Sequence, residues 1–85
     1  MAYNVEITPQ ARRAIQKLPP EIAAAAFALF ERLADNPRLL GSKKLSGSDQ
    51  YRIRFGDYRV LYGIQDKMLI VSIFKVAHRR EVYRK

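Results

Sequence analysis

The stretch YRIRFGDYRVLY, residues 51–62, decides the fold of this chain. Its two halves alternate between apolar and basic side chains, which predicts two half-buried strands. Gly56-Asp57 between the halves is typical of a two-residue hairpin turn. With that turn Arg54 pairs with Arg59, and directly paired residues share one face of a sheet. We therefore predict an antiparallel hairpin whose other face, made of apolar and aromatic side chains, packs on a core.

Three arginines, Arg52, Arg54 and Arg59, share the second face of this hairpin. Like charges that face each other across a sheet destabilise the pairing, so a purely structural role would favour a neutral or acidic partner for Arg54. Guanidinium groups keep their charge at physiological pH and bind phosphate oxygens through a fixed fork of donors. The pattern indicates a phosphate-binding face. The alternative is an ordinary solvated strand face, which antiparallel sheets often have.

The N-terminal half is predicted to form a strand and two helices. Residues 3–7 alternate in the manner of a half-buried strand. Thr8-Pro9 supplies an N-cap and a first helical residue, so a helix begins there and runs to about Leu18. Pro19-Pro20 breaks it, and a second helix follows as far as Asn36-Pro37. Because the break is short, we expect the two helices to form a hairpin.

The C-terminal half is predicted to form a loop and three strands. Residues 38–50 are rich in Gly, Ser and Lys and predict the loop. Strands are expected over Tyr51–Phe55, Tyr58–Gln65 and Met68–Val76, with Asp66-Lys67 as a second two-residue turn. The fold class is therefore α+β in the order β-α-α-β-β-β, a small antiparallel-dominated sheet with an N-terminal helical hairpin against one face. A chain of 85 residues makes one domain, residues 1–85.

The positive charge is concentrated in the C-terminal part. The net charge is +8, and residues 51–85 carry nine of the 16 Lys and Arg residues but only three of the eight Asp and Glu residues. Such a field favours a polyanionic partner, namely nucleic acid, the ribosome or an acidic protein. A basic surface that only aids solubility is the alternative.

Several classes of protein are excluded by residue content. The chain has no cysteine and a single histidine, so disulfide scaffolds, thiolate zinc sites and histidine-rich metal sites are ruled out, and we expect no metal or cofactor. The N-terminus lacks the pattern of a signal peptide. The longest apolar stretch, Ile22–Leu29, is far too short to span a membrane. We expect a cytoplasmic protein.

The last residues combine charge with aromatic and imidazole groups. The segment KVAHRREVYRK, residues 75–85, interleaves basic residues with His78 and Tyr83. An RNA-binding surface uses such a mixture, with charge for the phosphates and rings for base stacking. An exposed histidine and an ordinary packing tyrosine are the alternatives.

Four segments together resemble the RelE/ParE toxin superfamily. They are residues 2–20 (AYNVEITPQARRAIQKLPP), residues 44–47 (KLSG), residues 51–62 and residues 76–83 (VAHRREVY). The resemblance covers nearly the whole chain and implies the RelE-like microbial RNase fold. It also implies the toxin of a type II toxin–antitoxin system.

The superfamily divides by activity, and the ending H-R-x-x-V-Y is more typical of its RelE-like members. These are ribosome-dependent endoribonucleases that cut mRNA in the ribosomal A site and inhibit translation. ParE-like members instead inhibit DNA gyrase, and this activity remains the first alternative. The second is a non-catalytic nucleic-acid-binding module, although nothing in the chain resembles a helix-turn-helix.

The resemblance also assigns roles to single residues. Arg52 and Arg54 fall on positions that are basic in many relatives, and Arg59 falls on an arginine expected to hold the scissile phosphate. Arg79 falls on an arginine expected to act at the leaving group, and Tyr83 on a tyrosine expected to stack on or orient a base. Further contacts to RNA are expected from Lys44, Arg80, Arg84 and Lys85.

The general base is left open. The implied reaction is attack by the RNA's own 2′-hydroxyl, which leaves a cyclic phosphate and requires no metal. It needs a proton acceptor, stabilisation of negative charge and a proton for the leaving oxygen. Arginine stays protonated at physiological pH, so it supplies only the second. His78 has a suitable ordinary pKa, and Tyr83 is the other candidate.

The expected partners are an antitoxin, the ribosome and mRNA. The antitoxin would cover the basic face or displace the C-terminal tail, with acidic and apolar groups that complement the arginines. The exposed parts of the two helices are the alternative docking surface, and the sequence does not decide between them. The toxin–antitoxin complex is expected to bind operator DNA through the antitoxin.

Overall fold

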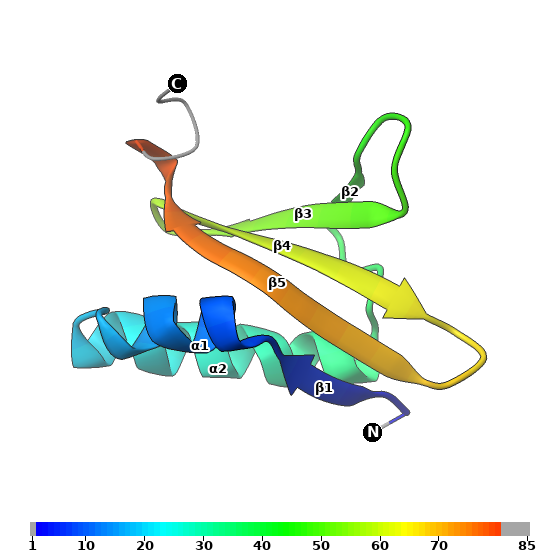
Figure 1. Cartoon of the computed structure of the whole chain (residues 1–85), viewed down its shortest axis with the longest axis horizontal. Helices are drawn as coiled ribbons and strands as arrows, with labels where there is room; N and C mark the ends of the chain where they lie inside the picture. The colour runs from blue at the N-terminus through cyan, green and yellow to red at the C-terminus, as the bar shows by residue number, and fades with distance from the viewer. Residues whose placement is uncertain (1, 81–85) are drawn as a thin grey trace.

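The computed structural model describes residues 2–80, which form a single mixed sheet with two helices against one face (Figure 1). In chain order the elements are β1 (Asn4–Ile7), α1 (Pro9–Gln16), α2 (Pro20–Asp35), β2 (Lys43–Lys44), β3 (Gln50–Phe55), β4 (Tyr58–Gln65) and β5 (Ile70–His78). Within the described range the sheet has five strands in the order β1-β5-β4-β3-β2. β1 is parallel to β5, and the other pairs are antiparallel. The predicted α+β class and antiparallel-dominated sheet are confirmed.

The β3–β4 hairpin has the predicted register. Phe55 pairs with Tyr58 and Arg54 with Arg59. Gly56 has a φ of 55°, the left-handed conformation that glycine adopts without steric cost and that a tight hairpin turn requires at its first central position. This turn fixes which side chains of both strands meet the helices.

The helices begin where the sequence predicts. Thr8 caps α1, because its Oγ1 accepts a hydrogen bond from the backbone N–H of Ala11 at 3.3 Å. Pro9 occupies the first turn. α1 ends at Gln16, slightly before the predicted Leu18. No helix within residues 2–80 is long and apolar enough to cross a membrane.

Two predictions of local structure were wrong. Lys43 and Lys44, predicted as loop, form the short strand β2 opposite Arg52 and Tyr51; a strand of two residues shows no periodicity that a sequence pattern can reveal. The second turn spans residues 66–69 rather than Asp66-Lys67, because Leu69 has a φ of 55° and β5 begins only at Ile70. The apolar run from Met68 onward looked like strand, but its first two residues are exposed in the turn.

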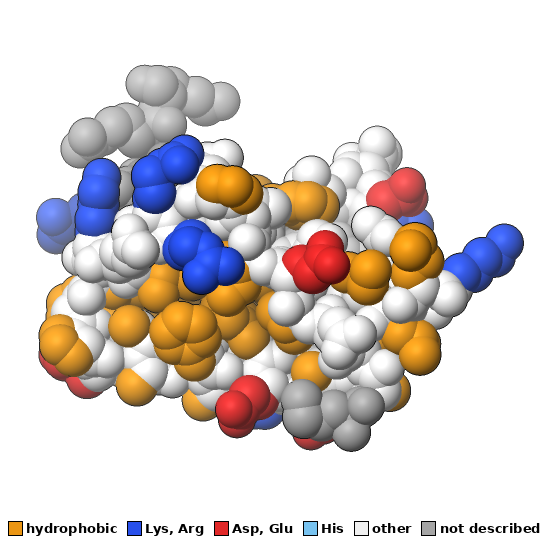
Figure 2. All heavy atoms as spheres, turned by 60° about the horizontal axis from the view of Figure 1, so that its bottom comes forward, with side chains coloured by type: hydrophobic (Ala, Val, Ile, Leu, Met, Phe, Trp, Pro, Cys, Tyr) orange, Lys and Arg blue, Asp and Glu red, His pale blue; other side chains and the backbone are white. Residues whose placement is uncertain are grey.

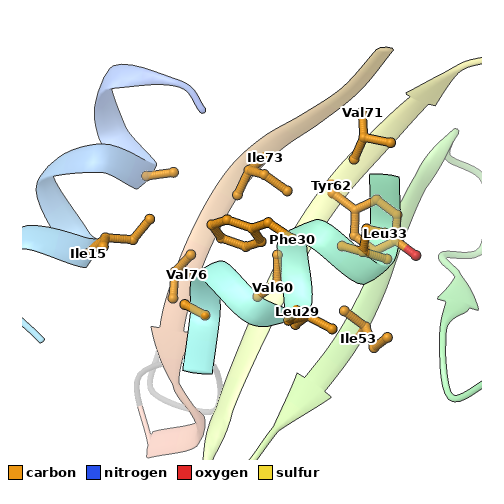
Figure 3. Close-up of a cluster of buried hydrophobic side chains, with 12 residues drawn as sticks. Ile15, Leu29, Phe30, Leu33, Ile53, Val60, Tyr62, Val71, Ile73 and Val76 are labelled. Atoms are coloured by element: carbon orange, nitrogen blue, oxygen red, sulfur yellow. The ribbon is translucent and has the colours of Figure 1, made fainter. Parts of the chain in front are cut away.

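The core lies between the helices and one face of the sheet (Figure 3). Leu33 of α2 is fully buried against strand residues that include Val60, Tyr62 and Ile73. The hydroxyl of Tyr62 donates a hydrogen bond to the carbonyl oxygen of Pro37 at 2.6 Å, so this buried phenol is satisfied. One sheet face is therefore used for packing, and the other is left for polar and charged residues.

An exposed network ties the ends of three segments together. The Arg38 guanidinium donates two hydrogen bonds to the Asp66 carboxylate, at 3.1 and 2.9 Å, and the Tyr3 hydroxyl donates a third at 2.7 Å. These contacts join the start of β1, the loop after α2 and the β4–β5 turn. The hydrogen bonds from Arg38 and Tyr3 lower the pKa of Asp66 to about 2.

Replacing Leu33 with alanine is expected to destabilise the domain severely. The side chain is 0% exposed, and a buried Leu→Ala change costs about 2 to 5 kcal/mol, much of the stability of a small domain. Urea denaturation followed by circular dichroism measures the loss. Leu40→Ala is the matched control, because Leu40 is 100% exposed and its replacement should leave the midpoint nearly unchanged. Equal effects of the two changes would contradict the core described here.

Replacing Asp66 with asparagine is expected to lower stability at neutral pH but not at pH 2. The pKa of Asp66 is depressed in the folded protein, so its ionised form adds stability above pH 4, and this is lost as the pH falls towards 2. The melting temperatures of wild type and D66N should therefore converge over that interval. Asp49→Asn, at an exposed loop position, is the control. A gap between wild type and D66N that persists at pH 2 would contradict the prediction.

Candidate nucleic-acid interface

The sheet face away from the helices carries a basic surface that four strands build. We call it the arginine face; it consists of Lys43, Arg52, Arg54, Arg59 and Lys75. Arg54 lies opposite Arg59, and Arg52 lies between Lys43 on β2 and Leu61 on β4. Lys75 lies on the other side of Leu61. Since paired residues share a face, one row of the sheet runs Lys43, Arg52, Leu61, Lys75.

A small cleft lies at the end of this face, around the β3–β4 turn. Its volume is about 120 Å³, room for roughly four water molecules. The cleft is lined by Arg54, Gly56, Asp57, Tyr58, Arg59 and Arg79. We call it the arginine cleft, because three guanidinium-bearing residues from β3, β4 and the segment after β5 meet there.

The three arginines of the cleft differ in exposure. Arg59 is 5% exposed, whereas Arg54 is exposed and the Arg79 side chain is 64% exposed. Arg59 therefore lies at the base of the cleft and the other two at its rim. A cation held away from bulk water attracts an anion more strongly than a solvated one, because the local dielectric constant is lower.

Asp57 holds Arg79 at the cleft. The backbone N–H of Arg79 donates a hydrogen bond to the Asp57 carbonyl oxygen at 2.7 Å. The Asp57 carboxylate also lies 4.0 Å from the Arg79 guanidinium, at the outer limit of an ion pair. The ion pair is exposed, so it adds little to stability, and the backbone hydrogen bond is the contact that fixes Arg79 beside Asp57.

Neither His78 nor Lys44 lines the arginine cleft. His78 pairs with Tyr58 on the helix-facing side of the sheet, and its ring meets the Tyr58 ring edge-on at 5.1 Å. Its Nδ1 accepts a hydrogen bond from the Arg80 backbone N–H at 3.2 Å. Lys44 pairs with Tyr51, whose side chain packs against the core, so Lys44 also belongs to the helix-facing side.

The remaining predicted residues fall in three places. Arg52 lies on the arginine face but does not line the cleft. Arg80 is exposed directly after Arg79. The predictions for Tyr83, Arg84 and Lys85 lie outside the described residues.

Sequence reasoning missed three charged residues of this surface. The sequence pattern predicts Asp57 only as a turn residue, whereas the structure places it in the lining of the arginine cleft. Lys43 was assigned to a loop, and its place beside Arg52 depends on the short strand β2. Lys75 requires the register of β5, which a bulge shifts between Leu61 and Tyr62. Within residues 2–80 no group of three His, Asp or Glu side chains could hold a metal ion.

Basic side chains gather at one end of the molecule. In the view from the helical side, Lys and Arg collect at upper left, near where β5 ends, and hydrophobic side chains cover much of the surface below them (Figure 2). The fold and the cleft thus define a small basic α+β protein with an arginine-lined cleft at one end of its sheet.

Comparisons with known proteins give the family. The sequence model of the ParE toxin of type II toxin–antitoxin systems matches residues 5–83. The chain is 39% identical to toxin RelG of Mycobacterium tuberculosis, with each chain fully covered. It is 40% identical to toxin RelE of the same organism, over 96% of this chain and 87% of the relative. The chain belongs to the RelE/ParE family of type II toxins.

Solved structures share the fold. The toxin–antitoxin complex RelBE2 of Mycobacterium tuberculosis superposes with a TM-score of 0.82 at 39% identity, covering 93% of this chain and 100% of that one. The RelE–RelB complex of Pyrococcus horikoshii gives a TM-score of 0.81 at 30% identity, covering 93% and 97%. The predicted superfamily and its fold are confirmed.

Replacing Asp57 with asparagine is expected to tighten the binding of inorganic phosphate. The change keeps the backbone carbonyl that holds Arg79 and removes a negative charge from the wall of the cleft. One charge about 5 Å from an anion in a solvated site changes affinity roughly two- to fivefold. Titration followed by NMR shifts of Arg54, Arg59 and Arg79 measures it, with Asp49→Asn as control. Unchanged or weaker binding by D57N would show that the cleft does not take the anion.

Proposed function

We propose that this chain is a ribosome-dependent endoribonuclease, a toxin that cuts mRNA in the ribosomal A site and so inhibits translation. The observation that carries the proposal is the convergence of Arg54, Arg59 and Arg79 on one phosphate-sized cleft. The toxins RelG and RelE are its relatives over nearly the full chain, which favours the RelE-like activity.

Each arginine has a position that suits a step of the reaction. In this proposal Arg59, at the base of the cleft, holds the scissile phosphate, and Arg54, its partner across the strand pair, supports it. When the 2′-oxygen bonds to phosphorus and the bond to the 5′-oxygen breaks, negative charge develops on the phosphoryl oxygens and the leaving oxygen. In this proposal Arg79, which is exposed at the rim, stabilises the leaving oxygen. Arg52 extends the charge along the face towards the next phosphate.

The proton acceptor is a separate question. His78 pairs with Tyr58 but does not itself line the cleft, which weakens its candidacy. Tyr83 remains a candidate by resemblance, and the Asp57 carboxylate joins it because it lines the cleft. Alignment of the RNA by the ribosome would supply the rest of the rate, since positioning alone accelerates such reactions greatly.

An antitoxin is the partner that keeps the toxin inactive in this proposal. The neighbouring structures are complexes of toxins with antitoxins. A groove of about 660 Å³ between α2 and the β3 edge joins apolar Ala28 and Leu29 to basic Arg52 and Arg54, with no acidic residue in its lining. A segment that is acidic and apolar fits this groove and would cover two of the arginines. The complex would bind operator DNA through the antitoxin.

One observation favours a second function. The family model that matches residues 5–83 is that of ParE toxins. Resemblance to ParE-like members implies that the chain inhibits DNA gyrase without catalysis. A gyrase inhibitor causes DNA breaks in growing cells and leaves translated mRNA intact. The two activities are therefore separable in one set of assays.

The deciding experiment is primer extension on a defined message translated in a reconstituted system. We expect cuts only where ribosomes occupy the message, and a loss of at least about 100-fold in Arg79→Ala, comparable to removal of one group that stabilises transition-state charge. Arg13→Ala is the matched control, because Arg13 is an exposed arginine on α1.

Other outcomes point elsewhere. Growth arrest with DNA breaks and no cuts would establish the gyrase inhibitor. Cuts of equal strength in R79A would keep the nuclease but remove Arg79 from its site. Absence of both cuts and toxicity would leave a non-catalytic binding module.

A further inference from the structure

Phe74 is an aromatic residue of β5 whose ring lies on the arginine face and not in the core. In β5 the neighbouring Ile73 and Val76 pack in the core. Tyr62 pairs with Ile73 and Leu61 with Lys75, so Phe74 is the extra residue of a β-bulge. The bulge leaves Phe74 free to turn its ring to the arginine face.

Gly63 provides the surface on which that ring lies. Gly63 sits on β4 between Gln50 and Ser72, and its missing side chain would point to the arginine face, opposite to buried Tyr62. A methyl group on Gly63 would lie 2.9 Å from Cε2 of Phe74 and 3.2 Å from Cζ. The ring therefore rests on bare backbone, and Phe74 stays partly exposed.

The bulge is held by the cap of α1. The Thr8 hydroxyl donates to the Phe74 carbonyl oxygen at 3.3 Å, and the Thr8 backbone N–H donates to the Ile73 carbonyl oxygen at 3.1 Å. The same hydroxyl oxygen caps the helix. Phe74 is thus fixed by the helical layer although its ring lies on the other side of the sheet.

The charges around the ring suit a nucleic acid strand. Lys75 follows Phe74 and is exposed, and Arg52 lies one strand beyond Leu61 in the same row. On the other flank Glu6 pairs with Ser72. A polyanion that reaches the ring would therefore lie towards β4 and β3, where the arginines are, and away from β1.

We propose that Phe74 is a base-stacking platform for an unpaired RNA base, on a strand whose neighbouring phosphate occupies the arginine cleft. Gly63 is four residues from Arg59 along β4, about 13 Å at 3.3 Å per residue, a distance that a stretched dinucleotide spans. An aromatic ring stacks on any base, so the platform orients the strand without reading sequence. The proposal rests on the proposed function for its RNA partner.

A tryptophan at this position is the reporter. The chain has no tryptophan, so F74W carries a single one, which can be excited apart from the five tyrosines, and a base stacked on it quenches its fluorescence. Short single-stranded RNA is the probe, in the absence of ribosomes, beside the same strand with abasic sites and beside inorganic polyphosphate. We expect quenching by the intact RNA alone. F27W is the matched control, because Phe27 is a 48% exposed phenylalanine on α2, and it should not be quenched.

Affinity variants separate stacking from packing. F74A and F74L should each bind the RNA at least about fivefold more weakly, whereas F27L should bind as wild type does. F74L keeps an apolar side chain over Gly63, so a loss of RNA affinity in F74L is due to the missing aromatic ring. Equal affinity of wild type and F74L, or equal quenching by intact and abasic RNA, would overturn the platform.

The test of the Phe74 platform can be separated from the test of RNA cleavage. Quenching without ribosome-dependent cuts would keep the platform and remove the nuclease. Cuts by the wild type with undiminished RNA binding and cleavage in F74A would keep the nuclease and remove the platform. Failure of the wild type to bind free RNA would also count against it, because a stacking surface should contribute affinity by itself.

Discussion

The register of the β3–β4 hairpin is the constraint on which the rest of the molecule depends. Gly56 in its left-handed conformation closes the turn in two residues, and this sets Ile53 against Val60 and Arg54 against Arg59. A slip of one residue would exchange the faces, burying guanidinium groups and exposing the core. The burial of Val60 and Tyr62 under α2 is therefore what holds the arginines on the other side. One face of the hairpin therefore packs in the core, and the other carries Arg54 and Arg59.

That hairpin could be predicted from the sequence because its pattern is local. Alternation and a Gly-Asp turn specify pairing within twelve residues, and the caps and prolines around the helices are equally local signals. What escaped prediction depends on contacts between distant segments. β2 forms only because it pairs with β3. Leu69 is apolar and was therefore predicted to lie in a strand, but it adopts a positive φ in the β4–β5 turn.

The candidate site shows the same division. Arg54 and Arg59 were placed together correctly because they sit on one hairpin. Whether Arg79 joins them depends on where β5 ends, and there the Asp57 carbonyl oxygen fixes its backbone. His78, one residue earlier, is the last residue of β5, where it pairs with Tyr58 and does not line the cleft. Proximity in sequence to Arg79 gave no indication of this separation.

The bulge in β5 links these observations. A regular strand would keep one alternation from Ile70 to His78, and it would carry either Ile73 or Val76 to the solvent side. Inserting Phe74 as an extra residue lets both remain in the core and releases one aromatic ring to the arginine face. Thr8 holds the bulge while it caps α1, so a single hydroxyl connects the helical layer to the strand residue whose ring lies on the arginine face. Repulsion among the arginines opposes the folded state, and the helices and buried strand residues offset it from the other side of the sheet. An anion that enters the cleft relieves this repulsion, so binding and folding favour the same arrangement.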